Sequence, residues 1–182
     1  MEKNINFNLN LNKQTLANFI SFLPFGFGAI IFAKLAIEIL YVKPEYITFL
    51  FLIAYFVSLI SAEILKRIFY KRFKGTERPQ GARGCDFFSI GPDVSGRRGF
   101  PSGHMSVTSA CCVLIILFLA FKSESIGIRS NKIRLGLILV NIILIILMGW
   151  ARHYKKCHNL LQIGGGTILG TIIAALLFFL KK

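Results

Sequence analysis

Two histidines lie beside residues that can bind an anion. The stretch PSGH places His104 directly after Ser102 and Gly103, at the start of a long apolar run. Free backbone N–H groups at the start of a helix bind anions, and Ser is a favoured N-cap. These three residues therefore offer a hydroxyl, an unhindered N–H and an imidazole to a phosphate-like group. A four-residue motif of this kind is a weak signal when it stands alone.

Two further motifs carry cations and a second site histidine. In KRFKGTERP, Lys71 precedes Arg78 by seven residues, and in ARHYKKCH, Arg152 precedes His158 by six. Fixed cations stabilise the charge of a transferring phosphoryl group. A histidine can act as a nucleophile, or as a general acid and base near neutral pH. The combination indicates an anion site with acid–base groups.

Long apolar segments must position these residues. The 182-residue chain is 54% hydrophobic and 16% charged, which is typical of a membrane protein. Five runs of 17 to 22 residues contain no Asp, Glu, Lys or Arg, and this length fits a spanning helix: 14–33, 46–62, 105–121, 135–151 and 159–180. Backbone groups in lipid must be paired within each helix. We therefore expect an all-α, integral membrane bundle of about five transmembrane helices, in a single domain over residues 1–182.

The connections between these helices hold the polar residues. Residues 1–13 are polar and are expected to be loose or interfacial, and no cleavage site for a signal peptide follows the first run. Residues 67–101 form the longest loop. Five crossings bring this loop, PSGH and ARHYKKCH to one membrane face. The long loop is therefore expected to carry the active site.

Two short patterns predict local contacts within the bundle. Lys34 and Glu38 are one helical turn apart near the end of the first span, and are expected to pair or to reach the interface. Gly166 and Gly170 have the small-xxx-small spacing that allows two helices to approach closely in a membrane.

The chain is strongly basic, with a formal net charge of +14 from 22 Lys and Arg and 8 Asp and Glu. This excess fits an anionic lipid, an anionic substrate or nucleic acid. Nucleic acid is the weakest of these, because the chain is too apolar for a groove binder, and we expect no nucleic acid partner. Several cations near the motifs are interpreted mainly as a collar for lipid headgroups: Lys66, Arg67, Lys74, Lys155 and Lys156.

Taken in order on one membrane face, the motifs K-x6-RP, PSGH and R-x5-H resemble the type 2 phosphatidic acid phosphatase family over residues 71–162. The resemblance implies a metal-independent lipid phosphate phosphatase, a phosphoric monoester or diphosphate hydrolase of the membrane. It also implies that His158 is the nucleophile and forms a phosphohistidine, while His104 protonates the leaving oxygen and then activates water. The phosphoryl oxygens would be held by Lys71, Arg78, Ser102, the Gly103 N–H and Arg152.

The chain departs from the family pattern within the third motif. Ala151 stands where the family usually has Ser, and Gln162 stands where it has the Asp that fixes the tautomer of the nucleophile. If a helix has begun by His158, Gln162 lies beneath it and its carbonyl can accept the ring N–H. Asp86 and Asp93 are the alternative acceptors. We expect a slower enzyme in which Gln162→Asp keeps or raises the rate of phosphoenzyme formation.

The favoured function is hydrolysis of a lipid phosphate or diphosphate that enters from the bilayer. The alternative is a catalytically weak or inactive family member that binds anionic lipid phosphate without turnover. The sequence is less consistent with a channel or transporter, because the expected helices lack a charged pathway at the membrane midplane. No metal or other cofactor is expected, since no carboxylate or cysteine cluster could hold a metal. The oligomeric state does not follow from the sequence.

The charges and the cysteines bear on which side of the membrane the motifs face. The face with the motifs carries 14 of the 22 Lys and Arg, which favours the cytoplasm. Phosphate binding explains three of these 14, which leaves 11 Lys and Arg on this face against 8 on the other. The family resemblance implies a non-cytoplasmic active site. Cys85 and Cys157 lie near the motifs and could form a disulfide in an oxidising compartment, while two free thiols are an equal alternative.

Overall fold

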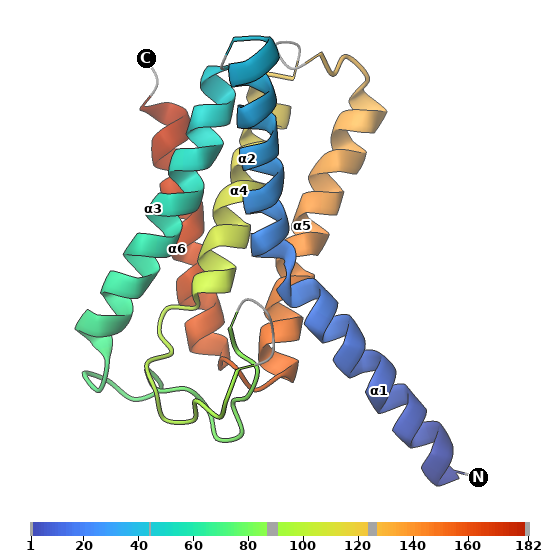
Figure 1. Ribbon diagram of the computed structural model, residues 1–182, viewed down its shortest axis with the longest axis vertical. Helices are drawn as coiled ribbons and strands as arrows, with labels where there is room; N and C mark the ends of the chain where they lie inside the picture. The colour runs from blue at the N-terminus through green and yellow to red at the C-terminus, as the bar shows by residue number, and fades with distance from the viewer. Residues whose placement is uncertain (1, 44, 87–90, 124–126, 181–182) are drawn as a thin grey trace.

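The computed structural model describes residues 2–43, 45–86, 91–123 and 127–180, and these residues form a bundle of helices with one long loop (Figure 1). The helices are α1 (Glu2–Ser21), α2 (Leu23–Tyr41), α3 (Tyr46–Phe69), α4 (Gly103–Phe121), α5 (Asn131–Tyr154) and α6 (Leu160–Phe179). Among the described residues, five segments are long and apolar enough to cross a membrane, and the end of α1 joins α2 in the first of them. The predicted all-α multi-pass membrane bundle is confirmed.

The first span contains a break between α1 and α2. Pro24 stands in the first turn of α2, and its missing N–H interrupts the hydrogen bonds that would continue α1. As a result α1 leads away from the bundle (Figure 1). Residues 2–13 were expected to be loose or interfacial. They are helical, since neither Pro nor Gly interrupts α1, so the loose alternative is wrong, and the interfacial location stays a prediction.

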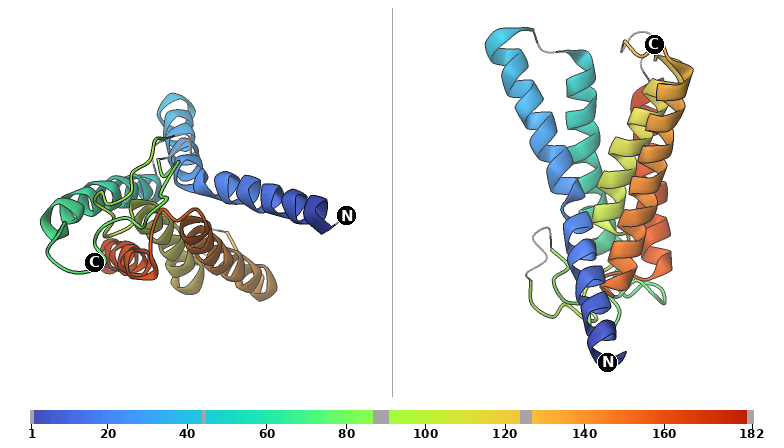
Figure 2. Two further views of the ribbon diagram at one scale, coloured as in Figure 1. Left: turned by 90° about the horizontal axis from the view of Figure 1, so that it is seen from below. Right: turned by 90° about the vertical axis from the view of Figure 1, so that its right-hand side faces the viewer.

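Successive spans run in opposite directions, which separates the connections into two groups (Figures 1 and 2). The long loop between α3 and α4 lies at the same end as the α5–α6 connection. The α2–α3 connection and the end of α6 lie at the other end. We call these the site end and the opposite end. The three motifs therefore meet at one end of the bundle, as the five crossings predict.

The central helix is α4, which is buried along most of its length and packs closely against α6. The close approach depends on the two glycines predicted to permit it. A Cβ atom on Gly166 would collide with the carbonyl oxygen of Ser102, and one on Gly170 would collide with that of Ser106. Because Ser102 precedes α4, this packing also fixes the start of α4 at the site end.

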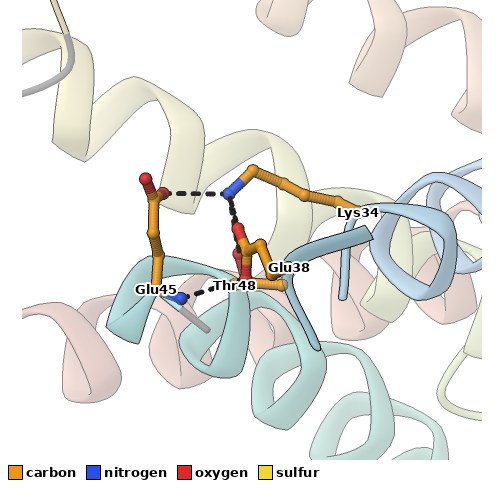
Figure 3. A network of polar contacts seen from close by, with 4 residues as sticks. All are labelled: Lys34, Glu38, Glu45 and Thr48. Carbon is orange, nitrogen blue, oxygen red and sulfur yellow. Dashed lines mark hydrogen bonds and ion pairs between the residues drawn. The ribbon is translucent and has the colours of Figure 1, made fainter. Parts of the chain in front are cut away.

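A polar network ties α2 to α3 at the opposite end (Figure 3). Lys34 and Glu38 form the predicted ion pair. The Lys34 Nζ also donates to Glu45 Oε2 at 2.9 Å and to the Thr48 hydroxyl at 2.8 Å. The Glu38 carboxylate accepts from the Thr48 hydroxyl at 2.8 Å and from the Glu45 backbone N–H at 3.0 Å. These contacts hold the two helices together far from the motifs.

Candidate active site

The long loop folds back on itself across the site end. The Arg78 N–H donates to Arg97 O at 2.8 Å, and the Gly96 N–H donates to Arg78 O at 3.1 Å. Further along, the Val94 N–H donates to Ala82 O at 2.8 Å. These bonds pair the segment that carries Arg78 with the segment that leads to α4, so the backbone of Arg78 has a fixed position.

A disulfide joins this loop to the connection between α5 and α6. Cys85 and Cys157 are bonded, with their Cα atoms 5.4 Å apart; both are buried with Ala82, and the partly buried Val94 packs against them. Of the two alternatives left open by the sequence, the structure contains the disulfide. The bond lies one residue before His158, so it anchors the loop next to the third motif.

A cavity of about 420 Å³ lies between the loop and the helix ends. Four of the predicted site residues line it together: Arg78, Gly103, His104 and His158. The remaining lining residues come from α3 and the loop, and they are Leu59, Ile60, Glu63, Lys66, Cys85 and Asp86. The cavity thus combines two imidazoles, two cations and the N-terminus of α4 with an apolar wall from α3.

The lysine of this cavity is Lys66, and the predicted Lys71 does not line it. Lys71 is exposed in a separate depression and its Nζ lies over the ring of Tyr70, 5.3 Å from the ring centroid. Lys71 lies outside the cavity because α3 ends at Phe69 and the backbone of Lys71 then turns with a φ of 60°. Lys66 lies inside α3, where its Nζ is 3.5 Å from the position of a Cβ on Gly103.

Lys66, interpreted from the sequence mainly as part of a lipid collar, thus lines the cavity. A signal for it was present in the sequence, because Ser58, Ala62 and Lys66 are spaced by four residues and share one helix face. Ser58 and Ala62 are buried in the bundle. The Nζ of Lys66 also pairs with the carboxylate of Glu63 at 3.1 Å, which orients it at the rim of the cavity.

Two predicted phosphate-binding side chains, Ser102 and Arg152, are not among the residues that line the cavity. The hydroxyl of Ser102 caps α4 by accepting from the Met105 N–H, as expected for an N-cap. Arg152 is fully buried, and its Nη2 donates to Cys85 O at 2.7 Å while its Nη1 contacts the Ser21 hydroxyl at 3.4 Å. Its Nε has no hydrogen-bond partner within the described part of the chain. The Nε–H of Arg152 is therefore a buried hydrogen-bond donor that is available near the site.

Gln162 lies beneath His158, where the sequence places it. The Nδ1 of His158 is 2.9 Å from the Gln162 Oε1. The Gln162 Nε2 donates to the carbonyl oxygens of Gly75 and Glu77, both at 2.7 Å. Carbonyl oxygens only accept, so the NH₂ group of the amide must face them and Oε1 must face the imidazole. His158 consequently carries its proton on Nδ1 and keeps the lone pair on Nε2.

The surroundings of His158 favour its neutral form. Burial lowers the pKa of His158 well below its ordinary value, and the cations of Arg152 and Arg78 lower the pKa further. The hydrogen bond with Gln162 acts in the opposite direction. A neutral imidazole with a free lone pair is the form that a nucleophilic histidine requires.

Asp86 and Asp93, the alternative acceptors for the His158 ring proton, have different surroundings. Asp93 accepts the Ser95 N–H at 2.8 Å and pairs with Arg83 at 3.4 Å, so it belongs to the loop. Asp86 lines the cavity. Gln162 is therefore the acceptor that the structure assigns to His158.

Lys155, interpreted from the sequence as part of the collar, is a buried lysine. It is 7% exposed, and its Nζ has no hydrogen-bond partner among the residues that the structure describes. Burial and the charge of Arg152 lower the pKa of Lys155 to about 8, against the influence of Asp86. No sequence signal separated Lys155 from its exposed neighbour Lys156.

A sequence profile of the PAP2 superfamily matches residues 51–181. The chain belongs to the PAP2 superfamily. The matched region contains most of α3, the long loop and α4 to α6, and so includes every residue of the cavity. Neither a curated protein nor a solved structure matches the chain. Membership of the PAP2 superfamily supports phosphatase activity in general.

Proposed function

We propose that this PAP2 protein is a membrane phosphohydrolase that removes phosphate from a lipid phosphate or diphosphate through a phosphohistidine at His158. The observation that carries the proposal is one cavity that joins His104, His158 and Arg78 to an apolar wall at the end of a membrane-spanning helix. The catalytic groups and a place for a lipid tail are thus adjacent.

The phosphate of the substrate binds among the cations at the start of α4. Arg78 and Lys66 line the cavity, and Gly103 offers an unhindered N–H at a helix N-terminus. We propose Lys66 for the role that the motif assigned to Lys71. Arg152 adds positive charge beside His158, and its unpaired Nε gains a partner from a phosphoryl oxygen.

The first chemical step transfers the phosphoryl group to the protein. The Nε2 lone pair of His158 attacks phosphorus while Nδ1–H stays bonded to the Gln162 Oε1. The bond between phosphorus and the lipid oxygen breaks, and His104 gives its proton to that oxygen. The lipid leaves as an alcohol, or as a monophosphate when the substrate is a diphosphate. The cations stabilise the charge of the phosphoryl oxygens in the transition state.

The second step releases phosphate and restores the site. The neutral His104 takes a proton from water, whose oxygen attacks phosphorus as the P–N bond to His158 breaks. The electron pair of that bond returns to Nε2, inorganic phosphate leaves, and His104 is again protonated. Splitting one hard displacement into two easier ones is the benefit of a covalent intermediate.

The apolar wall of the cavity supports a lipid substrate. Leu59 and Ile60 lie within α3, one of the helices able to span a membrane, and Ile60 is 57% exposed on the outside of the bundle. A headgroup in the cavity would place its tail along this face of α3. The substrate would therefore enter sideways from the bilayer while phosphate leaves to water.

The alternative of an inactive phosphate-binding protein arises from the loss of the family's Asp. The structure weakens the reason for this alternative, because Gln162 already supplies the acceptor for the Nδ1 proton of His158. The amide lacks the negative charge of Asp, so a slower first step remains the expectation.

Phosphate release from the purified protein tests the proposal. The substrates are phosphatidic acid, phosphatidylglycerol phosphate, a prenyl diphosphate, a lipid A phosphate and, as a soluble comparison, glycerol phosphate, each with and without excess chelator. We expect one lipid class to be hydrolysed far faster than glycerol phosphate, with no loss in chelator. His158→Ala should be inactive, whereas His153→Ala, which changes an exposed histidine outside the cavity, should match the parent. Activity in His158→Ala, or equal hydrolysis of glycerol phosphate, would contradict the proposal.

A further inference from the structure

The two cysteines of the disulfide each accept a hydrogen bond from an arginine of the site. The carbonyl of Cys85 accepts from Arg152 Nη2 at 2.7 Å, and the carbonyl of Cys157 accepts from Arg78 Nη1 at 3.2 Å. Bonds to a charged donor are among the stronger hydrogen bonds in proteins. The orientation of both guanidinium groups therefore depends on the backbone at the disulfide.

Each of these two arginines bonds to a cysteine of the segment to which the arginine itself does not belong. Arg78 belongs to the long loop but bonds to Cys157 in the α5–α6 connection, while Arg152 belongs to α5 but bonds to Cys85 in the long loop. The disulfide is the covalent link between the same two segments. If the segments separated, both arginines would lose their carbonyl partners together.

The nucleophile is attached to the same unit. His158 follows Cys157 directly, and the N–H groups of Cys157 and His158 both donate to the carbonyl of Arg152, at 3.0 and 3.2 Å. A shift of the Cys157 backbone would therefore move His158 relative to Arg152. The disulfide is therefore adjacent to His158 in the chain and hydrogen-bonded through its cysteine carbonyls to Arg78 and Arg152.

We propose that the Cys85–Cys157 disulfide is a positioning element for Arg78 and Arg152, so that its reduction disables phosphate binding and turnover. The proposal rests on the proposed function, because it assumes that these arginines bind the phosphoryl group. A disulfide with this role needs an oxidising compartment, which supports an active site on the non-cytoplasmic face of the membrane.

The reaction that switches the site is ordinary thiol–disulfide exchange with a dithiol such as dithiothreitol. The dithiol supplies two electrons and two protons, the S–S bond of the protein breaks, and Cys85 and Cys157 become thiols. The reductant leaves as its own cyclic disulfide. Oxidised glutathione reverses the change by taking two electrons from the two thiols.

Reduction of the folded, purified protein is the test, with the redox state of Cys85 and Cys157 followed by peptide mass mapping. Two readouts are taken: kcat/KM for the best lipid phosphate, and the affinity for vanadate, which resembles phosphate. A displacement of about 1 Å at a catalytic group lowers rates by roughly 10²-fold, so we expect kcat/KM to fall on that scale and vanadate affinity to fall with it. Oxidised glutathione should restore both.

Variants separate this effect from a general loss of structure. Cys85→Ser and Cys157→Ser should resemble the reduced protein and be insensitive to dithiothreitol. Cys111→Ala and Cys112→Ala, which change the two free cysteines of α4, should respond to the reductant like the parent. The melting temperature is measured alongside, because a bond that only stabilises the fold would change it without changing vanadate affinity at a temperature where the protein is folded.

Three results would overturn the inference. They are free thiols at Cys85 and Cys157 in the protein purified without reductant, unchanged kinetics and vanadate affinity after verified reduction of the disulfide, or a change in melting temperature alone. If no redox state hydrolyses any phosphate substrate, the proposed function fails separately. Vanadate affinity then decides the positioning role by itself.

Discussion

The Nδ1 of His158 lies 2.9 Å from the Oε1 of Gln162, and the other end of that amide donates to two loop carbonyls, Gly75 O and Glu77 O. Gln162 therefore does two things that a carboxylate could not do together. It accepts the proton of the nucleophile, and it donates twice to the loop that carries Arg78. An Asp at this position would place negative charge against two carbonyl oxygens and would also be shorter by one carbon.

Gln162→Asp should therefore harm the protein, which reverses the expectation from the sequence. Gly75 O would keep the hydrogen bond from Asn159 Nδ2 at 3.0 Å, whereas Glu77 O would lose the Gln162 donor. A hydrogen bond contributes about 0.5–1.5 kcal/mol to stability, so the melting temperature should fall and single-turnover phosphoenzyme formation should slow. Gln162→Ala should slow the same step, because the Nδ1 proton loses its acceptor. A Gln162→Asp protein with the parent's stability and rate would disprove the double role of the amide.

Gly99 leaves room for the larger amide side chain. A Cβ at Gly99 would lie 2.6 Å from the Gln162 Oε1 and 2.7 Å from its Nε2. Gly99→Ala should push the amide off His158, with a loss of about 1–3 kcal/mol in unfolding free energy and a slower first step. Gly164→Ala is the control, because a Cβ there meets nothing within 4 Å. It should leave the rate unchanged, and equal effects of the two substitutions would contradict this account.

The choice between the two lysines is tested by a matched pair of substitutions. Lys66→Met should lower kcat/KM by roughly 10²-fold, the scale of losing one group that stabilises the transition state. Lys71→Met should have little effect, because Lys71 is exposed outside the cavity. Steady-state kinetics on the same lipid phosphate decide the matter. If Lys71→Met is the crippled variant, the loop must rearrange on binding substrate.

The pKa of His158 predicts how its ring titrates. Burial and the cations of Arg152 and Arg78 lower this pKa, so the free protein should keep a neutral His158 as the pH falls through the range in which an ordinary histidine becomes protonated. NMR titration of labelled histidine, assigned with His158→Asn, measures this directly. Arg78→Met should raise the pKa of His158 by removing one cation. Protonation of His158 at or above its ordinary pKa would contradict the described surroundings.

The sequence predicted the spans and four of the ten residues that line the cavity, since runs without charge mark helices in lipid and motif spacing survives in the fold. It could not predict the position of Lys66, because that depends on where α3 ends and how the backbone turns at Lys71. The helical N-terminal segment was missed because its many Asn residues suggested a loose chain. The two loop carbonyls that bond to Gln162 come from residues more than eighty positions away, and no local pattern reports such a contact.

The most direct test of the central claim is to trap the intermediate. The purified protein is mixed rapidly with its lipid phosphate, quenched in alkali to preserve phosphohistidine, and digested for peptide mass spectrometry. We predict one phosphoryl group on His158 within the first turnover. In His104→Ala the water attack is blocked, so phosphohistidine should accumulate to a higher level when the substrate has a leaving group good enough to react without the acid. Turnover with no phosphoryl group on His158, or with the group on another residue, would contradict the account.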